Sequence, residues 1–156
     1  MSVHVRRAAN DDGDAILALM PRLASFDLPK SRNPVDLWRS DAAMLQRWLD
    51  GQAAECLVHV AVNDTQEILG FTLVSLRPEL LSHEPSAHLE AIAVAEGAEG
   101  MGVGQALLAA AEAEAMAHGA QTITLHVFAV NTRARDFYEK SGYDGELIRY
   151  IKELAD

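Results

Sequence analysis

A glycine-rich turn between a predicted strand and a predicted helix is the clearest chemical signal in this sequence. Gly100, Gly102 and Gly104 stand at alternate positions, and an Ala-rich helical pattern follows them. Glycines let the backbone approach a ligand and point its N–H groups outward, and a helix N-terminus adds partial positive charge. The turn therefore favours a phosphate or pyrophosphate ligand. The alternative is a tight strand–helix connection with no binding role.

Two common phosphate-binding motifs do not fit this turn. The spacing of Gly97 and Gly102 matches the Walker pattern G-x-x-x-x-G-K-S/T, but Val103 stands where that loop needs Lys. The dinucleotide fingerprint G-x-G-x-x-G ends on Gln105 when counted from Gly100. Counted from Gly102, it ends on a leucine. Neither a Walker loop nor a dinucleotide-binding turn is predicted.

An acidic residue inside a predicted strand is the second chemical signal. Glu90 lies among apolar residues, where a carboxylate is costly to bury without a role. It is a candidate general base or an anchor for a cation, and the alternative is a solvated strand face. His83, Glu84, His88 and Glu90 lie close together in sequence, but Pro85 prevents a helical metal-binding arrangement. No metal site is expected.

Hydrophobic periodicity predicts the elements that must position these residues. Asn10, Asp11 and Asp12 are candidate N-caps for a first helix, and further helices are expected over residues 35–49, 103–118 and 131–141. Strands are expected over residues 3–7, 56–62, 68–76, 88–94, 122–128 and 145–154.

The order of these elements predicts the fold class. Strands 56–62 and 68–76 are joined by a short polar turn, which indicates an antiparallel hairpin. The succession of strand 88–94, helix 103–118 and strand 122–128 indicates a parallel pair with a crossover helix. We predict an α/β protein with a mixed, mostly antiparallel central sheet flanked by helices. A chain of 156 residues fits a single domain over residues 1–156.

Composition excludes several classes of protein. Thirteen Lys and Arg against 23 Asp and Glu give a net charge of −10, which argues against nucleic-acid binding. Residues 51–100 carry eight acidic residues and one basic residue, Arg77. No apolar run approaches a membrane span. Cys56 is the single cysteine and lies in an apolar strand, so we expect a buried thiol and a cytoplasmic protein.

Three blocks of this sequence resemble the GCN5-related N-acetyltransferase (GNAT) superfamily. The window Glu99-Gly100-Met101-Gly102-Val103-Gly104 is similar to its acyl-CoA-binding signature R/Q-x-x-G-x-G/A. Residues 131–143 match the pattern N-x-x-A-x-x-F-Y-x-K-x-G-F/Y, and residues 88–94 correspond to the strand before the turn. The order of elements over the whole chain also agrees with that fold.

The resemblance implies an acetyl-CoA-dependent enzyme that transfers an acetyl group directly to a primary amine. Tyr138 matches the usual general acid, and Glu90 is the candidate base. The residues implied in binding acetyl-CoA are Ile92, Ala93, Val94, Glu99, Gly100, Met101, Gly102, Val103, Gly104, Gln105, Asn131, Arg133, Arg135 and Tyr138.

Each of the later residues also has a purely structural interpretation. Tyr138 can be a core aromatic, and Asn131 can be a helix N-cap. Arg133 and Arg135 can lie on a solvated face, with Arg135 paired to a glutamate one turn on. His126 is a minor candidate for the base.

The turn departs from the family pattern in its charge. Glu99 stands where the family usually has Arg or Gln. Glu96 stands at a position that is often Pro in the family, and Met101 at one that is often basic. These changes leave open an alternative, a catalytically weak acyl-CoA-binding or sensing module. The acidic middle of the chain favours a cationic acceptor, such as a polyamine, amino sugar or basic peptide. The family also makes a homodimer plausible.

Overall fold

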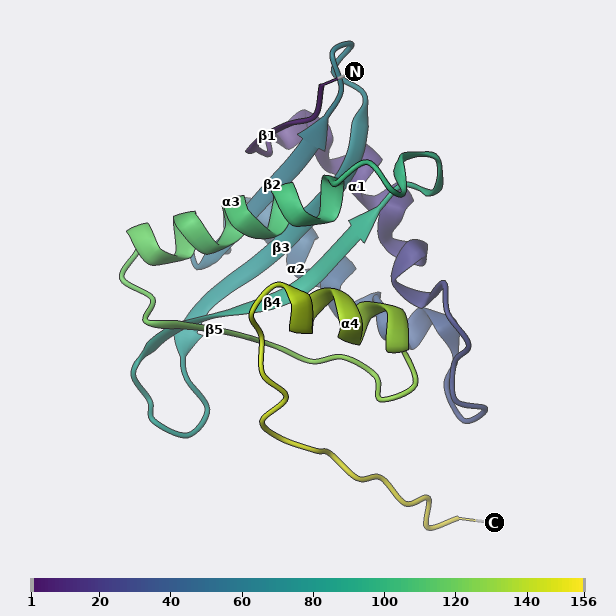
Figure 1. Cartoon of the computed structure of the whole chain (residues 1–156). Coiled ribbons are helices and arrows are strands. Elements are labelled where there is room, and N and C mark those ends of the chain that lie inside the picture. Colours follow the sequence, from purple (N-terminus) through teal and green to yellow (C-terminus); the bar gives the residue numbers. More distant parts are fainter. Residues whose placement is uncertain (1, 156) are drawn as a thin grey trace. The chain divides into compact units, whose positions relative to one another are not determined.

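The computed structural model describes residues 2–155, in two compact units that divide between His126 and Val127. The first unit contains a five-stranded sheet whose spatial order follows the sequence (Figure 1). Its strands are β1 (His4–Arg7), β2 (Cys56–Val62), β3 (Ile68–Pro78), β4 (Pro85–Val94) and β5 (Thr122–Leu125). Strands β1 to β4 pair antiparallel, and β5 pairs parallel to β4. The predicted mixed, mostly antiparallel sheet is confirmed.

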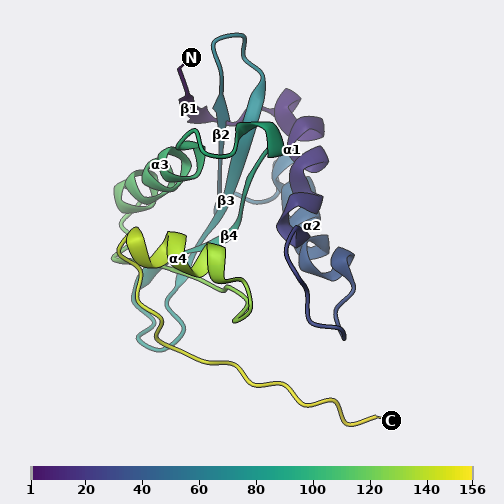
Figure 2. The ribbon, with the colours of Figure 1, turned by 45° about the vertical axis from the view of Figure 1, so that its right-hand side comes forward.

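Helices of the first unit cover both faces of this sheet. They are α1 (Gly13–Leu19), α2 (Arg39–Leu49) and α3 (Val103–Ala117), with 3-10 turns η1 (Asn10–Asp12), η2 (Met20–Ala24), η3 (Pro34–Leu37) and η4 (Glu96–Ala98). Helices α1 and α2 lie on one face, and α3 lies on the other (Figure 2). On the α1/α2 face, the buried side chains of Ile16, Met20 and Leu45 form a core with Phe71 and Leu73.

Helix α3 is the crossover between β4 and β5. Its apolar side chains recur at Val103, Leu107, Ala111 and Ala115, a spacing that forms one stripe along a helix, and all four are buried. Gly70 of β3 permits this close packing, because a Cβ there would lie 2.7 Å from a β4 carbonyl oxygen and 3.0 Å from Leu107 Cδ1. Helix α3 is thereby fixed against the sheet, and its N-terminus follows the glycine turn.

The second unit contains α4 (Thr132–Lys140). The side chain of Asn131 accepts a hydrogen bond of 3.2 Å from the backbone N–H of Ala134, so Asn131 is the N-cap of this helix.

The predicted last strand at residues 145–154 is wrong, because the structure has neither helix nor strand there. The large apolar residues of this segment are exposed, and all but Leu154 come as adjacent pairs, Leu147-Ile148 and Tyr150-Ile151. Adjacent pairs place apolar side chains on both faces of a strand. Because β-propensity reflects packing on a pleated, half-buried surface, it does not by itself produce a strand.

Several predicted boundaries also move. The helix expected from residue 35 begins at Arg39, after η3 and a non-helical Trp38. Strand β4 starts earlier than predicted, at Pro85, and β5 ends earlier, at Leu125. Within residues 2–155, no helix is long and apolar enough to cross a membrane.

Candidate active site

Strands β4 and β5 stop pairing in the middle of β4. Their parallel register runs from Ser86↔Thr122 to Leu89↔Leu125, where β5 ends, whereas β4 continues to Val94. The backbone of β4 beyond Leu89 therefore lies outside the described β4–β5 ladder. Backbone groups on such a stretch can hydrogen-bond to an extended ligand. Ile92, Ala93 and Val94, predicted from the sequence as ligand-binding, all belong to it.

A β-bulge lies at the same point. Leu73 pairs with Ala91 and Val74 pairs with Leu89, so Glu90 is the extra residue on β4. A bulge redirects a side chain and disrupts the local ladder, and bulges are common beside active sites. The bulge and the end of the β4–β5 pairing therefore coincide at Glu90, the candidate base.

The Glu90 carboxylate is half-buried and has polar partners. The Ser75 hydroxyl donates a short hydrogen bond to Oε2, and Arg77 Nη2 lies 3.7 Å from the same oxygen. The side chain of Glu90 is 16% exposed. The two contacts place a hydroxyl donor and a guanidinium beside this carboxylate. Glu90 is thus placed to accept a proton or to attract a cation.

Asp41 of α2 is a second acidic residue near Glu90, and sequence analysis missed it. Burial, with the negative charge of Glu90 as a second cause, raises the pKa of the Asp41 carboxyl to about 7. A signal was present in the sequence, because Asp41 lies four residues after Leu37 and four before Leu45, on the apolar stripe of the helix expected over residues 35–49. A carboxylate on such a stripe indicates a function or a partner.

His88 and His126 lie together where β4 and β5 diverge. Their ring centroids are 4.8 Å apart, and His88 Nδ1 is 2.8 Å from Thr124 Oγ1. Burial, followed by the positive charge of Arg77, lowers the pKa of His88 to about 4. His88 is therefore neutral at physiological pH. Its contact with Thr124 links β4 to β5. Among residues 2–155, no group of three or more His, Cys, Asp and Glu side chains could hold a metal ion.

The glycine turn leaves its backbone open. Gly100 and Gly102 have φ angles of +79° and +77°, and a Cβ built on Gly97, Gly100 or Gly102 meets no atom within 4 Å. Gly102 is the N-cap of α3 and has no capping side chain. Of the other predicted residues here, Val103 is buried, so only its backbone can bind a ligand, whereas Met101 is exposed. The geometry suits an anion held by backbone N–H groups.

Arg22 of η2 reaches this turn from a distant part of the sequence. Its Nε donates a hydrogen bond of 3.0 Å to the carbonyl oxygen of Val94, and its Nη2 forms a short ion pair with Glu99. No motif surrounds Arg22, so sequence analysis gave no reason to single it out. The Glu99 side chain, expected to oppose an anion, has a cationic partner.

Gly104 and Gln105 lie in the first turn of α3, and the remaining predicted residues belong to the second unit. The ring of Tyr138 lies 5.3 Å from that of Phe137 and 5.8 Å from that of Tyr143, and burial raises the Tyr138 pKa to about 12. Arg135 Nη1 donates a 3.0 Å hydrogen bond to the carbonyl oxygen of Ala129. Arg133 lies on the exposed side of α4.

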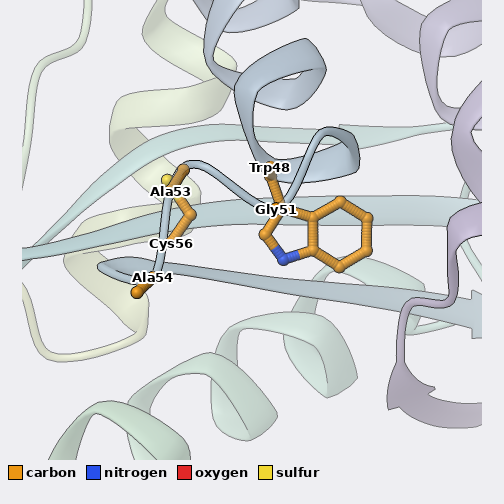
Figure 3. Close-up of a pocket in the computed structure, with 5 residues that line it drawn as sticks. All are labelled: Trp48, Gly51, Ala53, Ala54 and Cys56. Carbon is orange, nitrogen blue, oxygen red and sulfur yellow. The ribbon is translucent and has the colours of Figure 1, made fainter.

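A small pocket of about 200 Å³ in the first unit is lined by none of the predicted site residues. Figure 3 shows its lining by Trp48 at the end of α2, by residues of the following loop, and by Cys56 at the start of β2. Burial raises the pKa of the Cys56 thiol to about 11, so the thiol is protonated and inert, as predicted.

The chain is similar to known proteins both in sequence and in fold. A family model described as the acetyltransferase (GNAT) family matches residues 19–143. The mycothiol acetyltransferase of Renibacterium salmoninarum is 28% identical over 132 residues. That alignment covers 85% of this chain but only 38% of the relative, so the chain spans well under half of that protein's length.

Solved structures share the architecture at low sequence identity. The aminoglycoside antibiotic 6'-N-acetyltransferase AAC(6')-Ih of Acinetobacter baumannii has a TM-score of 0.75 at 18% identity, covering 99% of this chain and 100% of that one. The ribosomal-protein-alanine N-acetyltransferase of Brucella melitensis biovar Abortus 2308 has a TM-score of 0.71 at 17% identity, covering 98% and 100%. These likenesses concern the fold alone. With the family model matching from the end of α1 to beyond α4, the chain belongs to the acetyltransferase (GNAT) family.

Proposed function

We propose that this protein is an acetyl-CoA-dependent N-acetyltransferase that transfers an acetyl group directly to a primary amine of a cationic small molecule or peptide. The observation that carries the proposal is the position of Glu90. It is the bulge residue of β4, beside the last β4–β5 pair, with its carboxylate held by Ser75 and near Arg77. Family membership supplies the reaction class, and this site supplies the groups that can perform it.

Acetyl-CoA would bind along β4 and the glycine turn. Backbone groups of Ile92, Ala93 and Val94 would hold the acetyl–pantetheine arm. The N–H groups of residues 99–105 would hold the pyrophosphate, since the space a Cβ would fill at Gly100 and Gly102 is open. From the second unit, the resemblance adds Asn131, Arg133, Arg135 and Tyr138 as binding residues. Acetyl-CoA supplies an activated thioester carbonyl to the site.

Glu90 would manage the amine proton. An unperturbed alkylamine has a pKa near ~10.4 and is mostly protonated at neutral pH, so it must lose a proton before it attacks. The Glu90 carboxylate first attracts the ammonium group and then accepts its proton. As a bond forms between the amine nitrogen and the acetyl carbon, the carbon–sulfur bond breaks and its electron pair leaves on the CoA sulfur. The nitrogen loses its second proton in this step, and a proton from solvent neutralises the thiolate.

Tyr138 would assist the departing sulfur. With a pKa of about 12, its phenol keeps its proton at neutral pH. An ordinary thiol has a pKa near ~8.5, so complete transfer from this phenol to a thiolate is uphill. Tyr138 therefore acts by hydrogen-bond donation to the developing thiolate. Of the two protons that the amine loses, one neutralises the thiolate through solvent, and the other, accepted by Glu90, is released to solvent.

Asp41 and Glu90 would select the acceptor. Asp41, with a pKa of about 7, is only partly ionised at neutral pH, and a second positive group on the acceptor would favour its ionised form beside Glu90. The solved relatives act, by their names, on aminoglycosides and on a ribosomal protein, so acceptor choice varies on this fold. The acidic pair favours diamines, polyamines and amino sugars over neutral amines.

Detection of free CoA thiol over an amine panel tests this proposal. Polyamines, aminoglycosides, amino acids and basic peptides are compared with neutral amines, and acetyl-CoA binding is measured by calorimetry. We expect CoA release only with an amine, and fastest with polycationic ones. Acetyl-CoA binding with no release across the panel would instead support the sensing module. No acetyl-CoA binding would contradict both.

A further inference from the structure

The segment that contains the glycine turn has no cationic residue of its own. Between Arg77 and Arg133 the sequence contains neither Lys nor Arg, and this stretch includes all of β4, the turn, α3 and β5. Glu96 and Glu99 add negative charge beside the turn. Backbone N–H groups alone would then face a doubly charged pyrophosphate in an acidic surrounding. A cation at this site must come from elsewhere in the chain.

Arg22 is at the required position. It links the end of β4 to the turn. Its Nε donates a hydrogen bond to the carbonyl oxygen of Val94, 72 residues later in the sequence, and its Nη2 pairs with Glu99, 77 residues later. The Arg22 side chain is 26% exposed and that of Glu99 is 36% exposed, so the pair borders solvent. A guanidinium has five N–H donors and stays charged at all physiological pH values. The two contacts leave it further donors for an anion.

We propose that Arg22 is the cationic binding residue of this turn and contacts the pyrophosphate of acyl-CoA. The inference rests on the proposed function, because it assumes that CoA binds at the glycine turn. The Val94 carbonyl and Glu99 fix the guanidinium before the ligand arrives, so little side-chain entropy is lost on binding. Glu99 has a dual effect: it orients Arg22, and it also repels the phosphate.

Substitutions at both ends of the ion pair separate these effects. Arg22→Gln removes the charge but keeps an amide donor for the Val94 carbonyl, and Arg22→Lys keeps a charge without the planar fork. Glu99→Gln removes the repulsion. Arg47→Gln is the matched control, because Arg47 also pairs with a glutamate, Glu55, at the far end of α2. Melting temperatures without ligand report any loss of structure.

Calorimetry with CoA and with pantetheine, which lacks the phosphates, gives the deciding comparison. We expect Arg22→Gln to weaken CoA binding roughly tenfold and pantetheine binding less than about twofold, because one charge-assisted contact is lost. The CoA affinity of Arg22→Lys should lie between those of wild type and Arg22→Gln. The affinity of Arg47→Gln should equal that of wild type, and Glu99→Gln should bind CoA more tightly. The dependence of CoA affinity on salt should also shift in Arg22→Gln toward tighter binding at high salt.

Two results would overturn the inference. Unchanged CoA affinity in Arg22→Gln would show that the guanidinium does not contact the ligand. An equal loss for CoA and pantetheine would show that Arg22 only ties η2 to β4. Both results presuppose a wild-type protein that binds CoA. Failure of the wild type to bind CoA would instead contradict the proposed function.

Discussion

Asp41 keeps its proton at a pH where most carboxylic acids are ionised. Its pKa of about 7 arises from burial and from the negative charge of Glu90. In the unfolded chain the same group ionises near its ordinary value of 3.8. The folded state therefore holds a proton that the unfolded state releases between these values, so Asp41 lowers stability progressively as pH rises from about 4 to about 7. Such a cost is typical of binding and catalytic sites.

Asp41→Asn should therefore stabilise the protein and impair acceptor binding. Near pH 8 we expect a gain of roughly 1–3 kcal/mol in the free energy of unfolding, after allowance for partial solvent screening. The gain should fall toward zero near pH 4, because both states of the wild type are then protonated. Urea unfolding at several pH values measures the gain, and the KM for a polycationic amine should rise several-fold.

Asp50→Asn provides the control, since Asp50 is exposed just beyond the same helix. It should change neither stability nor KM by a measurable amount. If Asp41→Asn destabilised the protein near pH 8, the shifted ionisation inferred for Asp41 would be wrong.

At the scale of elements, the glycine turn depends on two backbone positions in the left-handed region, Gly100 and Gly102. Gly102 has a φ of +77°, and Gly97, five residues earlier, has an ordinary φ. A Cβ at Gly97 or at Gly102 would meet no atom within 4 Å, so these two glycines differ in backbone conformation and not in the room available for a side chain.

Gly102→Ala should accordingly lower the free energy of unfolding by about 1–2 kcal/mol or change the conformation of the turn, because a residue with a Cβ is strained by this amount in the left-handed region. CoA affinity should fall with it, since the turn N–H groups would lose their alignment. Gly97→Ala should leave both quantities within error. Thermal unfolding and calorimetry of the two variants make the comparison. Equal effects at both positions would refute a conformational role for Gly102.

The sequence identifies the parts of the site that lie on local motifs. The glycine turn and Glu90 were predicted from spacing and polarity in consecutive residues. The bulge at Glu90 depends on strand register, which a single strand does not reveal. Arg22 and Asp41 come from η2 and α2, and only tertiary packing brings them to β4 and the turn. The strand predicted at residues 145–154 failed for a related reason, because strand formation depends on pairing and burial as much as on propensity.

At the scale of the whole molecule, the net charge of −10 opposes a polyanionic cosubstrate and attracts a cationic acceptor. Locally, the turn offers backbone N–H groups and Arg22, whereas the α1/α2 face offers Asp41 and Glu90. The two ligands should therefore respond differently to ionic strength.

Raising the salt concentration from roughly 0.05 to 0.5 M should weaken acceptor binding several-fold, because screening shortens the reach of the acidic field. Acetyl-CoA binding should change by less than about twofold or become tighter, since salt also screens the unfavourable net charge. Steady-state KM values for the amine and calorimetric affinities for acetyl-CoA test this pair of expectations. A steep loss of acetyl-CoA affinity with salt would contradict it.

The central claim is that acetyl transfer to an amine depends on the Glu90 carboxylate. Its most direct test is the turnover of Glu90→Gln at saturating acetyl-CoA with the best amine of the panel. Glu153→Gln, in the exposed C-terminal segment, serves as the control. We predict at least about a 100-fold lower turnover for Glu90→Gln, as expected for loss of a general base. Acetyl-CoA affinity should stay within about twofold of wild type. Wild-type turnover in Glu90→Gln would contradict this account of the active site.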